Sequence, residues 1–548
     1  MIISPIKTKP ITFFWYFIAC LPILLFFYTF IIYAVNIPFL DDFTFFSFIP
    51  ILYNNSNGFN KISVFFSQHN EHRILTDRVV ALLIYAIKGN VDYEWMMLVG
   101  NSFLVGILVI YFKVFQQLNL SFKYFVSLSF LIFNTQIFEN SFWGMASVQN
   151  YGVILFVLIL FYLISSSKRN YFYFSFIIAF LATYTSGNGI LGSIVASILL
   201  LLQNRIKDCL IFSVFSLFLL GSYFYGYISP PTINYFNGVT SKDILIGFFS
   251  FLGAALDIFR NYSFRYIFTT SAGFIAFLGI GFFFRTSIFR SKLFYPNKAL
   301  NQVELFILGS ILFILVTTVI VVITRVNFGQ NSLLASRYRL YSILLFINLY
   351  FAALFYLKVG ITNKIIFPVL LIAICYNLIS NYQSNYDVVA LNKTRNCGLA
   401  NDIMANINKP IQSGILVYQK SPLWFDEFLP QFQKPIANSP IWGEEYSLKK
   451  STLFLFVIEN STESYLKKNQ CDGVYLLLQS HDNTYILPTN QRRNSIKNFL
   501  QTGQLWTNGF IGDFTRKQIL VGNYQLGIWM QKNNKGESFY LNDSLSIK

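Results

Sequence analysis

Residues 304–324 read ELFILGSILFILVTTVIVVIT, an apolar run long enough to cross the hydrocarbon core of a bilayer. Runs of similar length recur from Ile11 to Ser380. Of the 548 residues, 55% are hydrophobic and 12% are charged, whereas soluble proteins carry about twice that charged fraction. The composition excludes a soluble enzyme, a disordered chain and a disulfide scaffold. We therefore predict an α-helical polytopic membrane protein.

The apolar runs predict about eleven transmembrane helices within residues 1–380. The first run lacks a small-residue cleavage site after a short core, so we expect a retained helix rather than a signal peptide. The expected spans are 11–35, 93–115, 121–138, 148–166, 171–187, 188–204, 209–228, 266–284, 304–324, 337–357 and 362–380.

The net charge of +17 is concentrated in the short links between these runs. Lys and Arg recur in every second link, which indicates the cytoplasmic side and not a nucleic-acid partner. This orientation places the N-terminus inside and the C-terminus outside, provided that residues 244–260 do not span. Asp257 and Arg260 favour an interfacial or re-entrant segment there.

From residue 381 to 548 the hydropathy falls, and we expect a soluble extracytoplasmic domain, α/β or β-sandwich-like. Short alternating runs at 452–458, 473–479 and 519–531 predict strands. Cys397 and Cys471 could pair outside the cytoplasm, but nothing in their spacing requires it. Four tryptophans could stack on a glycan or simply fill a β core: Trp424, Trp442, Trp506 and Trp529.

The most informative residues are Asp41 and Asp42, which follow the first span among strongly apolar neighbours. Two adjacent carboxylates repel each other and lose solvation there, so a purely structural site would more cheaply use Asn or Ser. A desolvated carboxylate at a membrane rim suits the acceptance of a proton from a hydroxyl nucleophile. The structural alternative is an Asp that caps a helix over 43–53.

A second cluster lies in the long outer link 36–92, where 43–53 and 74–87 predict interfacial helices. It reads Gln-His-Asn-Glu-His-Arg over residues 68–73. If this stretch were helical, His69, His72 and Arg73 would share a face. The spacing of His69, Glu71 and His72 does not suit a metal on one helical face. We expect a polar wall of an active site, or ordinary helix-start chemistry.

A third cluster, Ser336-Arg337-Tyr338-Arg339, precedes a span at its outer end. Guanidinium groups at the headgroup level can grip a phosphate with two hydrogen bonds. Snorkelling arginines with a tyrosine belt are the structural alternative. Ser186-Gly187-Asn188-Gly189 allows close backbone approach to a ligand or a helix, or forms only a tight turn.

These features together resemble the GT-C-type integral-membrane glycosyltransferases, which use polyprenyl- or dolichyl-phosphate sugars as donors. The resemblance rests on the span number, on Asp41-Asp42 after the first helix, on the outer link 36–92 and on the C-terminal domain 381–548. The strings 70–73 and 336–338 are also similar to those of bacterial membrane proteins of this type. No single specificity subfamily is matched.

The resemblance implies that Asp42, or else Asp41, is the catalytic base that takes the proton of an acceptor hydroxyl. Arg337 with Tyr338 and Arg339 would bind and stabilise the departing lipid phosphate. The remaining substrate-binding residues expected by resemblance are Glu71, His72 and Arg73. We expect inversion at the anomeric carbon, no cofactor, and no metal, although some relatives use a divalent cation.

The expected partners are a polyprenyl-phosphate-sugar donor, a glycan, lipid or protein acceptor of the cell envelope, and membrane lipids. The composition favours a bacterial cytoplasmic membrane, with the active site on its outer side. Two other functions stay open: an envelope-polysaccharide polymerase or ligase, and a flippase or transporter without chemistry. Neither mid-span ionisable residues nor an internal repeat clearly favours the transporter.

Overall fold

The computed structural model describes residues 10–54, 58–228, 238–258, 264–288, 300–357, 359–404, 446–452, 455–460, 473–515, 519–532 and 535–547. Helices dominate as far as Met404, and strands follow from Tyr446. The chain divides into two compact units. The helical unit comprises residues 1–32, 47–83 and 95–383, and the sheet unit comprises 33–46, 84–94 and 384–548.

Eight helices within the described ranges are long and apolar enough to cross a membrane, which indicates a multi-pass membrane protein. Each matches one of the expected spans, while the expected number of about eleven is not confirmed. They are α1 (Pro10–Tyr33), α6 (Tyr93–Gln116), α9 (Gly144–Ile164), α12 (Ile206–Phe224), α14 (Arg265–Ile288), α15 (Gln302–Arg325), α17 (Arg339–Tyr356) and α18 (Val359–Met404).

The other three expected spans form shorter or broken helices. Segment 121–138 is interrupted at Asn134, whose side chain accepts a hydrogen bond from the Gln136 amide and starts a new turn. It contains η1 (Phe122–Tyr124), α7 (Val126–Ile132), η2 (Thr135–Ile137) and α8 (Phe138–Ser141). Segments 171–187 and 188–204 form α10 (Arg169–Thr185) and α11 (Gly189–Leu202), of 17 and 14 residues.

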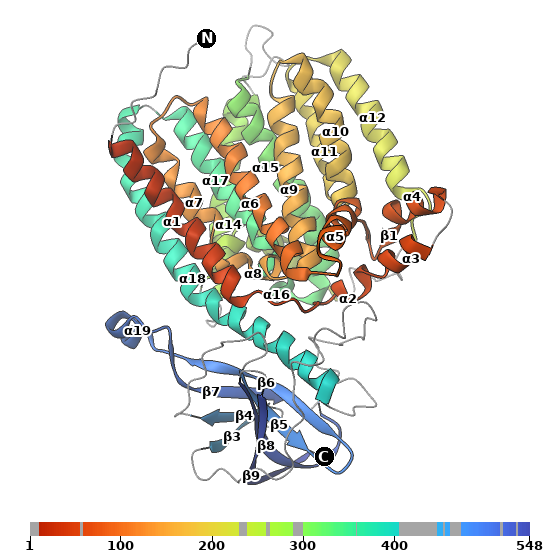
Figure 1. The fold of residues 1–548 in the computed structure, drawn as a ribbon. Helices are drawn as coiled ribbons and strands as arrows, with labels where there is room; N and C mark the ends of the chain where they lie inside the picture. Colours follow the sequence, from red (N-terminus) through yellow and green to blue (C-terminus); the bar gives the residue numbers. More distant parts are fainter. Residues whose placement is uncertain are drawn as a thin grey trace. The chain divides into compact units, whose positions relative to one another are not determined.

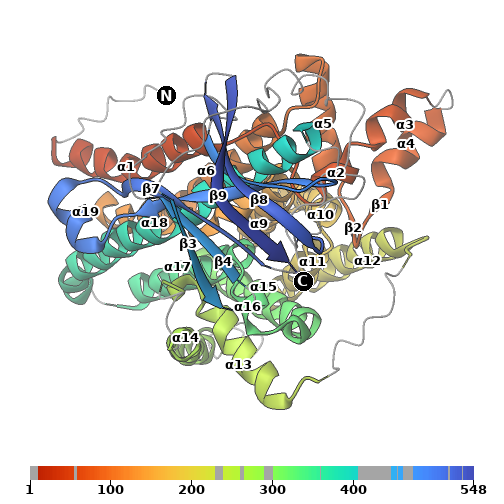
Figure 2. The ribbon, with the colours of Figure 1, turned by 90° about the horizontal axis from the view of Figure 1, so that it is seen from below.

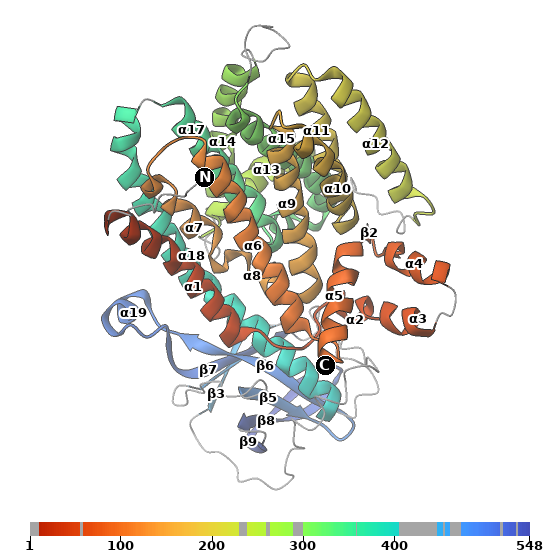
Figure 3. The same cartoon turned by 45° about the horizontal axis from the view of Figure 1, so that its top comes forward.

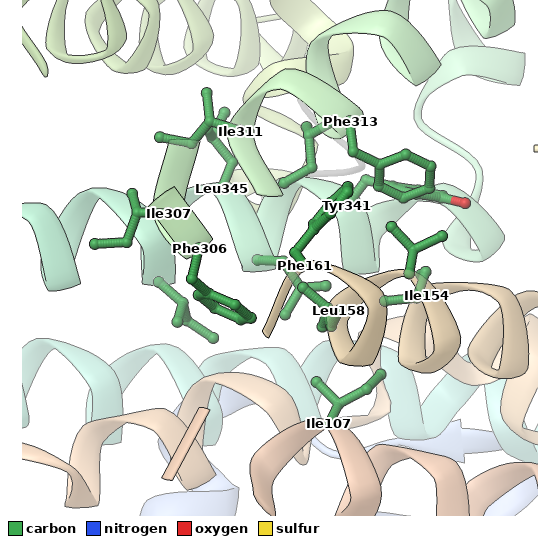
Figure 4. Close-up of a cluster of buried hydrophobic side chains, with 14 of the residues drawn as sticks. Ile107, Ile154, Leu158, Phe161, Phe306, Ile307, Ile311, Phe313, Tyr341 and Leu345 are labelled. Atoms are coloured by element: carbon green, nitrogen blue, oxygen red, sulfur yellow. The ribbon is translucent and has the colours of Figure 1, made fainter. Parts of the chain in front are cut away.

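The core of the helical unit lies where α6, α9, α15 and α17 meet (Figure 4). Phe161 of α9, Phe306 of α15 and Leu345 of α17 are all completely buried there. Figures 1 and 3 show α9 and α15 among the other helices of this unit. By contrast, α1, α12 and α14 leave large apolar side chains such as Ile31, Leu217 and Phe282 exposed, as lipid-facing helices do.

The long first link contains short elements rather than a span. The expected helices over 43–53 and 74–87 are confirmed, the first of them as two helices. The elements are α2 (Asp42–Phe45), α3 (Phe48–Asn54), α4 (Gly58–Phe66), β1 (Gln68–His69), β2 (His72–Arg73) and α5 (Leu75–Lys88). Four more short elements lie near the other links: η3 (Ala254–Leu256), η4 (Val326–Phe328), α16 (Gln330–Leu333) and η5 (Ser336–Tyr338).

Segment 244–260, expected to be interfacial or re-entrant, contains α13 (Ser241–Leu252), whose 12 residues are too few to span. A capping box between Thr240 and Asp243 starts this helix. Its end packs tightly against α14, because a Cβ on Gly253 would lie 2.0 Å from the Thr269 carbonyl oxygen. The described part of this segment therefore forms a short helix held closely against α14.

The sheet unit contains a seven-stranded antiparallel sheet in the order β3-β4-β7-β6-β5-β8-β9, whose strands β8 and β9 run side by side in Figure 2. The described strands thus form one sheet rather than a sandwich of two. They are β3 (Tyr446–Thr452), β4 (Leu455–Asn460), β5 (Gly473–Gln479), β6 (Thr484–Arg493), β7 (Trp506–Thr515), β8 (Gly522–Lys532) and β9 (Lys535–Ile547), with α19 (Ile496–Thr502) between β6 and β7.

The last expected span does not end at residue 380, because α18 continues as one helix to Met404. Its later part belongs to the sheet unit, where the Cys397 thiol donates to the Ile486 carbonyl at 2.9 Å. Cys397 is a free thiol, and Cys471 lies outside the described residues. Trp529 is fully buried and therefore fills the core, as expected for most of the tryptophans; Trp424 and Trp442 are not described.

Candidate active site

The two predicted catalytic aspartates differ in their surroundings within the sheet unit. Asp42 is 0% exposed, whereas Asp41 is half-buried. The Asp42 carboxylate accepts a hydrogen bond of 3.1 Å from the Phe39 amide, and the Asp42 amide donates to the Phe39 carbonyl. These reciprocal bonds close a tight turn over residues 39–42. The Asp42 carboxylate therefore stabilises the turn, and the Asp41 carboxylate is the more accessible of the two.

The helix-capping alternative does not describe Asp41. It precedes α2, but its side chain makes no capping hydrogen bond, and its φ of −65° and ψ of −15° are already helical. Leu40, directly before it, has a positive φ of 49°. That conformation costs a non-glycine residue roughly 1–2 kcal/mol, so other contacts must hold the turn.

Arg395 on α18 supplies such contacts. It is buried, and its guanidinium donates to the carbonyls of Val35 and Ile37. Asp42 is among the charged groups that act on it. Sequence reasoning missed this residue because the fall in hydropathy after 380 suggested a separate soluble domain. Residues 369–397 contain neither Gly nor Pro, and that unbroken stretch was a signal that the helix continues.

The cluster at 68–73 is a β-hairpin and not the helix that would place His69, His72 and Arg73 on one face. Asn70 at its tip has a φ of 49°, a left-handed conformation that Asn tolerates better than most residues and that turns the chain back. His69 pairs directly with His72, and Gln68 pairs with Arg73. The two histidines thus share one face of the hairpin, and Arg73 lies on the other face. Figure 1 shows β1 between α4 and the end of α12.

Arg73 is occupied by backbone carbonyls. Its guanidinium donates to Phe66 at the end of α4 and to Tyr223 and Tyr225 at the end of α12. Arg78 similarly donates to the carbonyls of Val64, Phe65 and Ser67. Both arginines hold carbonyls that a helix end leaves without partners. Arg73 therefore anchors the hairpin to its neighbours rather than facing a substrate.

Glu71 and His72 make contacts with two other parts of the helical unit. The Glu71 carboxylate forms a half-exposed ion pair of 3.5 Å with Arg325 at the end of α15. A Cβ on Gly187 would lie 3.7 Å from His72 Nδ1 and 2.9 Å from the Tyr223 hydroxyl. The 186–189 segment therefore approaches the hairpin closely, which a glycine at 187 allows.

Burial, followed by the charges of Arg78 and His72, lowers the pKa of His69 to about 4. Burial also lowers the pKa of Arg78 to about 10, with Asp77 opposing the shift and Arg73 adding to it. His69 is therefore neutral near pH 7, while Arg78 remains charged. The group that faces His72 across the hairpin is a neutral imidazole.

The backbone of Arg337 is held by a separate hydrogen-bond network in the helical unit. The Arg337 amide donates to the Glu139 carboxylate at 3.1 Å, and its carbonyl accepts from Asn140 at 3.0 Å. Ser336 joins the same network through the Glu139 amide. The Arg337 guanidinium lies 5.4 Å from the centre of the Tyr338 ring and forms no ion pair with a described residue. Its backbone is fixed while its cationic head remains available.

Arg339 has a different environment from Arg337. It is buried and donates to the Asp257 carboxylate at 2.6 Å and to the Leu334 carbonyl. Arg265 binds the same carboxylate from α14. The side chain that the sequence pattern suggested as a second phosphate ligand is therefore engaged in a buried ion pair that connects the end of η3 with α14 and α17.

The predicted residues are divided between the two units, and within the helical unit the hairpin residues 71–73 and Arg337 make different contacts. Asp41 and Asp42 belong to the sheet unit, and all the other predicted site residues belong to the helical unit. Within the described ranges, no three His, Cys, Asp or Glu side chains are arranged to hold a metal ion. Comparison of the chain with protein-family models, with curated proteins and with solved structures finds no match.

Proposed function

We propose that this chain is a membrane-bound glycosyltransferase of the GT-C type. It moves a sugar from a polyprenyl-phosphate-linked donor to a glycan, lipid or protein acceptor of the cell envelope. The observation that carries the proposal is the aspartate pair in the first link after α1, with Asp42 buried in a turn and Asp41 half-buried beside it. The Asp41 side chain makes no capping hydrogen bond to α2, and two adjacent carboxylates cost free energy through mutual repulsion in an apolar link.

The unequal burial favours Asp41 as the base, whereas the sequence pattern slightly favoured Asp42. The Asp41 carboxylate accepts the proton of the acceptor hydroxyl while that oxygen forms a bond to the anomeric carbon. The bond between this carbon and the phosphate oxygen breaks, and the lipid phosphate leaves with the electron pair. A single displacement of this kind inverts the anomeric configuration. Asp42 fixes the turn that carries Asp41.

Arg337 is assigned to the departing phosphate because its guanidinium is not paired with a carboxylate among the described residues. A guanidinium can bind two phosphate oxygens at once and stabilise the charge that grows on them. Tyr338 supports it through its ring. Glu71 and His72 are assigned to orientation of the acceptor, while Arg73 and Arg339 become structural residues.

Eight apolar helices suit a donor whose lipid tail stays in the bilayer. The proposal places the reaction at the outer face of a bacterial cytoplasmic membrane, on the same side as the C-terminal domain. It involves no cofactor, and proton transfer and charge stabilisation are assigned to side chains alone.

The experiment is incubation of purified, detergent-solubilised protein with a panel of radiolabelled polyprenyl-phosphate sugars. The readout is release of label from the lipid. We expect turnover by the wild type with at least one donor and none by the Asp41→Asn/Asp42→Asn double variant at equal folded concentration. Equal turnover by both proteins would exclude the aspartate mechanism. Absence of turnover with every donor would count against the donor class and favour a polymerase or a flippase.

A further inference from the structure

Arg395 is a buried charged residue of the sheet unit that contacts the link before the acidic pair. Its guanidinium donates to the carbonyls of Val35 and Ile37, and it lies 5.8 Å from the centre of the Phe39 ring. All three residues belong to the short link that leads from α1 to Asp41. An arginine provides five N–H donors in a fixed planar arrangement, which suits contact with several groups at once.

Asn392 extends the same contact along α18. Its side-chain amide donates to the Tyr33 carbonyl at 2.8 Å. Residues three apart lie on one helical face, so Asn392 and Arg395 present a common surface to the link. Together they hold the carbonyls of residues 33, 35 and 37, which leave the end of α1 in succession.

Arg395 also interacts electrostatically with Asp42 of the acidic pair. Asp42, Tyr93 and Glu94 are the titratable groups that act on its guanidinium. Both Arg395 and Asp42 are buried, and a buried charge is stable only with partners. The Asn36 side chain also accepts a hydrogen bond of 2.8 Å from the Tyr93 amide, which fixes the link at a second point.

The strained turn needs this support. Leu40 has a positive φ, and such a conformation persists only where surrounding contacts determine it. The contacts of Phe39 and Asp42 close the turn locally, but they do not fix the preceding residues 33–37. Arg395 and Asn392 bind carbonyls of that segment.

We propose that Arg395 is a positioning residue for the acidic pair. It holds the link 33–42 in the conformation that buries Asp42 and leaves Asp41 accessible. The inference rests on the proposed function for its catalytic consequence, while its structural content can be measured without any substrate. A lysine at 395 keeps the charge but supplies one nitrogen in place of the guanidinium fork, so it replaces the contact only in part.

The first measurement is hydrogen exchange of the full-length protein in detergent, followed in peptides that cover residues 33–46. Arg395→Met is expected to accelerate exchange at the Phe39 and Asp42 amides by about tenfold or more, and Arg395→Lys by less. The matched control is Arg205→Met, since Arg205 donates to the carbonyls of Ile164 and Ser166 in another link. This control should leave peptides 33–46 unchanged.

The second measurement is steady-state kinetics with the polyprenyl-phosphate sugar that the wild type turns over. Arg395→Met is expected to lower kcat at least tenfold with little change in KM for the donor, and Arg395→Lys to recover part of the loss. Asn392→Ala, a milder change on the same face, should shift both exchange and kcat in the same direction and keeps the test valid if Arg395→Met fails to fold.

The outcomes separate the two proposals. Unchanged exchange in peptides 33–46 of a folded Arg395→Met protein overturns the role of Arg395 in holding the link. Accelerated exchange with unchanged kcat overturns its positioning role. If the wild type releases sugar from no donor, the proposed function fails, and the exchange result still decides whether Arg395 holds the link.

Discussion

The Arg339 guanidinium on α17 donates a hydrogen bond of 2.6 Å to the Asp257 carboxylate, and both side chains are buried in the helical unit. Arg265 binds the same carboxylate. One carboxylate thus bridges two arginines from different helices, and the three side chains together carry a net charge of +1. A buried ion pair is weak evidence for stability as such, but removal of one partner leaves the other charge without compensation.

Asp257→Asn should therefore destabilise the helical unit strongly, by about 3–5 kcal/mol, because two guanidinium groups lose their counter-charge. The measurement is thermal unfolding of the detergent-solubilised protein. Asp208→Asn is the matched control, since Asp208 also pairs with two arginines, Arg169 and Arg205, but neither it nor Arg205 is completely buried and Arg169 is half-exposed. That change should cost about 1 kcal/mol or less. Equal effects of the two substitutions would contradict the account of Asp257.

Gly189→Ala should prevent correct packing of α10 against α11. A Cβ at this position would lie 2.0 Å from the Ala182 carbonyl oxygen, a distance that no side chain can accommodate without a backbone shift. Gly221→Ala is the control, because no atom lies within 4 Å of its added Cβ. We expect poor yield or a lowered Tm for the first variant and a wild-type elution profile for the second. A normal Tm for Gly189→Ala would contradict the close contact between Gly189 and the Ala182 carbonyl oxygen.

His69 should make the protein sensitive to mild acid. Its pKa is about 4 in the fold and near 6.5 in the unfolded chain, so the unfolded state binds the extra proton between these values. The contribution of neutral His69 to the free energy of unfolding is therefore fully present above pH 6.5 and is lost as the pH falls towards 4. The Tm of the wild type should fall more steeply between pH 7 and 5 than that of His69→Gln. Parallel Tm curves for the two proteins would exclude this contribution.

Arg337→Gln should impair transfer without unfolding the protein, because the backbone of Arg337 carries the contacts to Glu139 and Asn140. Loss of one preorganised cationic donor typically lowers kcat by about 10²–10³-fold. Initial rates of sugar release from the lipid donor are the measurement. The control, Arg169→Gln, removes an arginine that is half-exposed and paired with Asp208. A rate for Arg337→Gln within about twofold of the control would remove Arg337 from the mechanism.

The membrane helices could be predicted from the sequence because a span requires a continuous apolar run, which needs no tertiary information. Eight of the expected runs are such helices. Segments 121–138 and 188–204 show the limit of this reasoning. An Asn cap interrupts the first, and the second ends shortly before Asn204, whose φ of 57° is left-handed; neither feature changes the hydropathy.

The site residues illustrate a different limit. Position along the chain suggested Asp41, Asp42 and Glu71 as candidates, but it could not show which carboxylate is buried. Arg337 and Arg339 are two residues apart and look equivalent in the sequence. Their roles diverge because Asp257, far away in the chain, lies against only one of them. Arg395 was missed for the same reason, since its partners near residues 33–42 lie more than 350 positions earlier.

The most direct test of the central claim is the initial rate of label release from a polyprenyl-phosphate sugar by Asp41→Asn alone. The comparison is with wild type and with Asp208→Asn, which makes the same chemical change at the ion pairs of Asp208 with Arg169 and Arg205. If Asp41 is the base, Asp41→Asn should lose about 10²–10⁴-fold in rate while Asp208→Asn keeps the wild-type rate. An Asp41→Asn protein that is folded and transfers sugar at the wild-type rate would contradict the account.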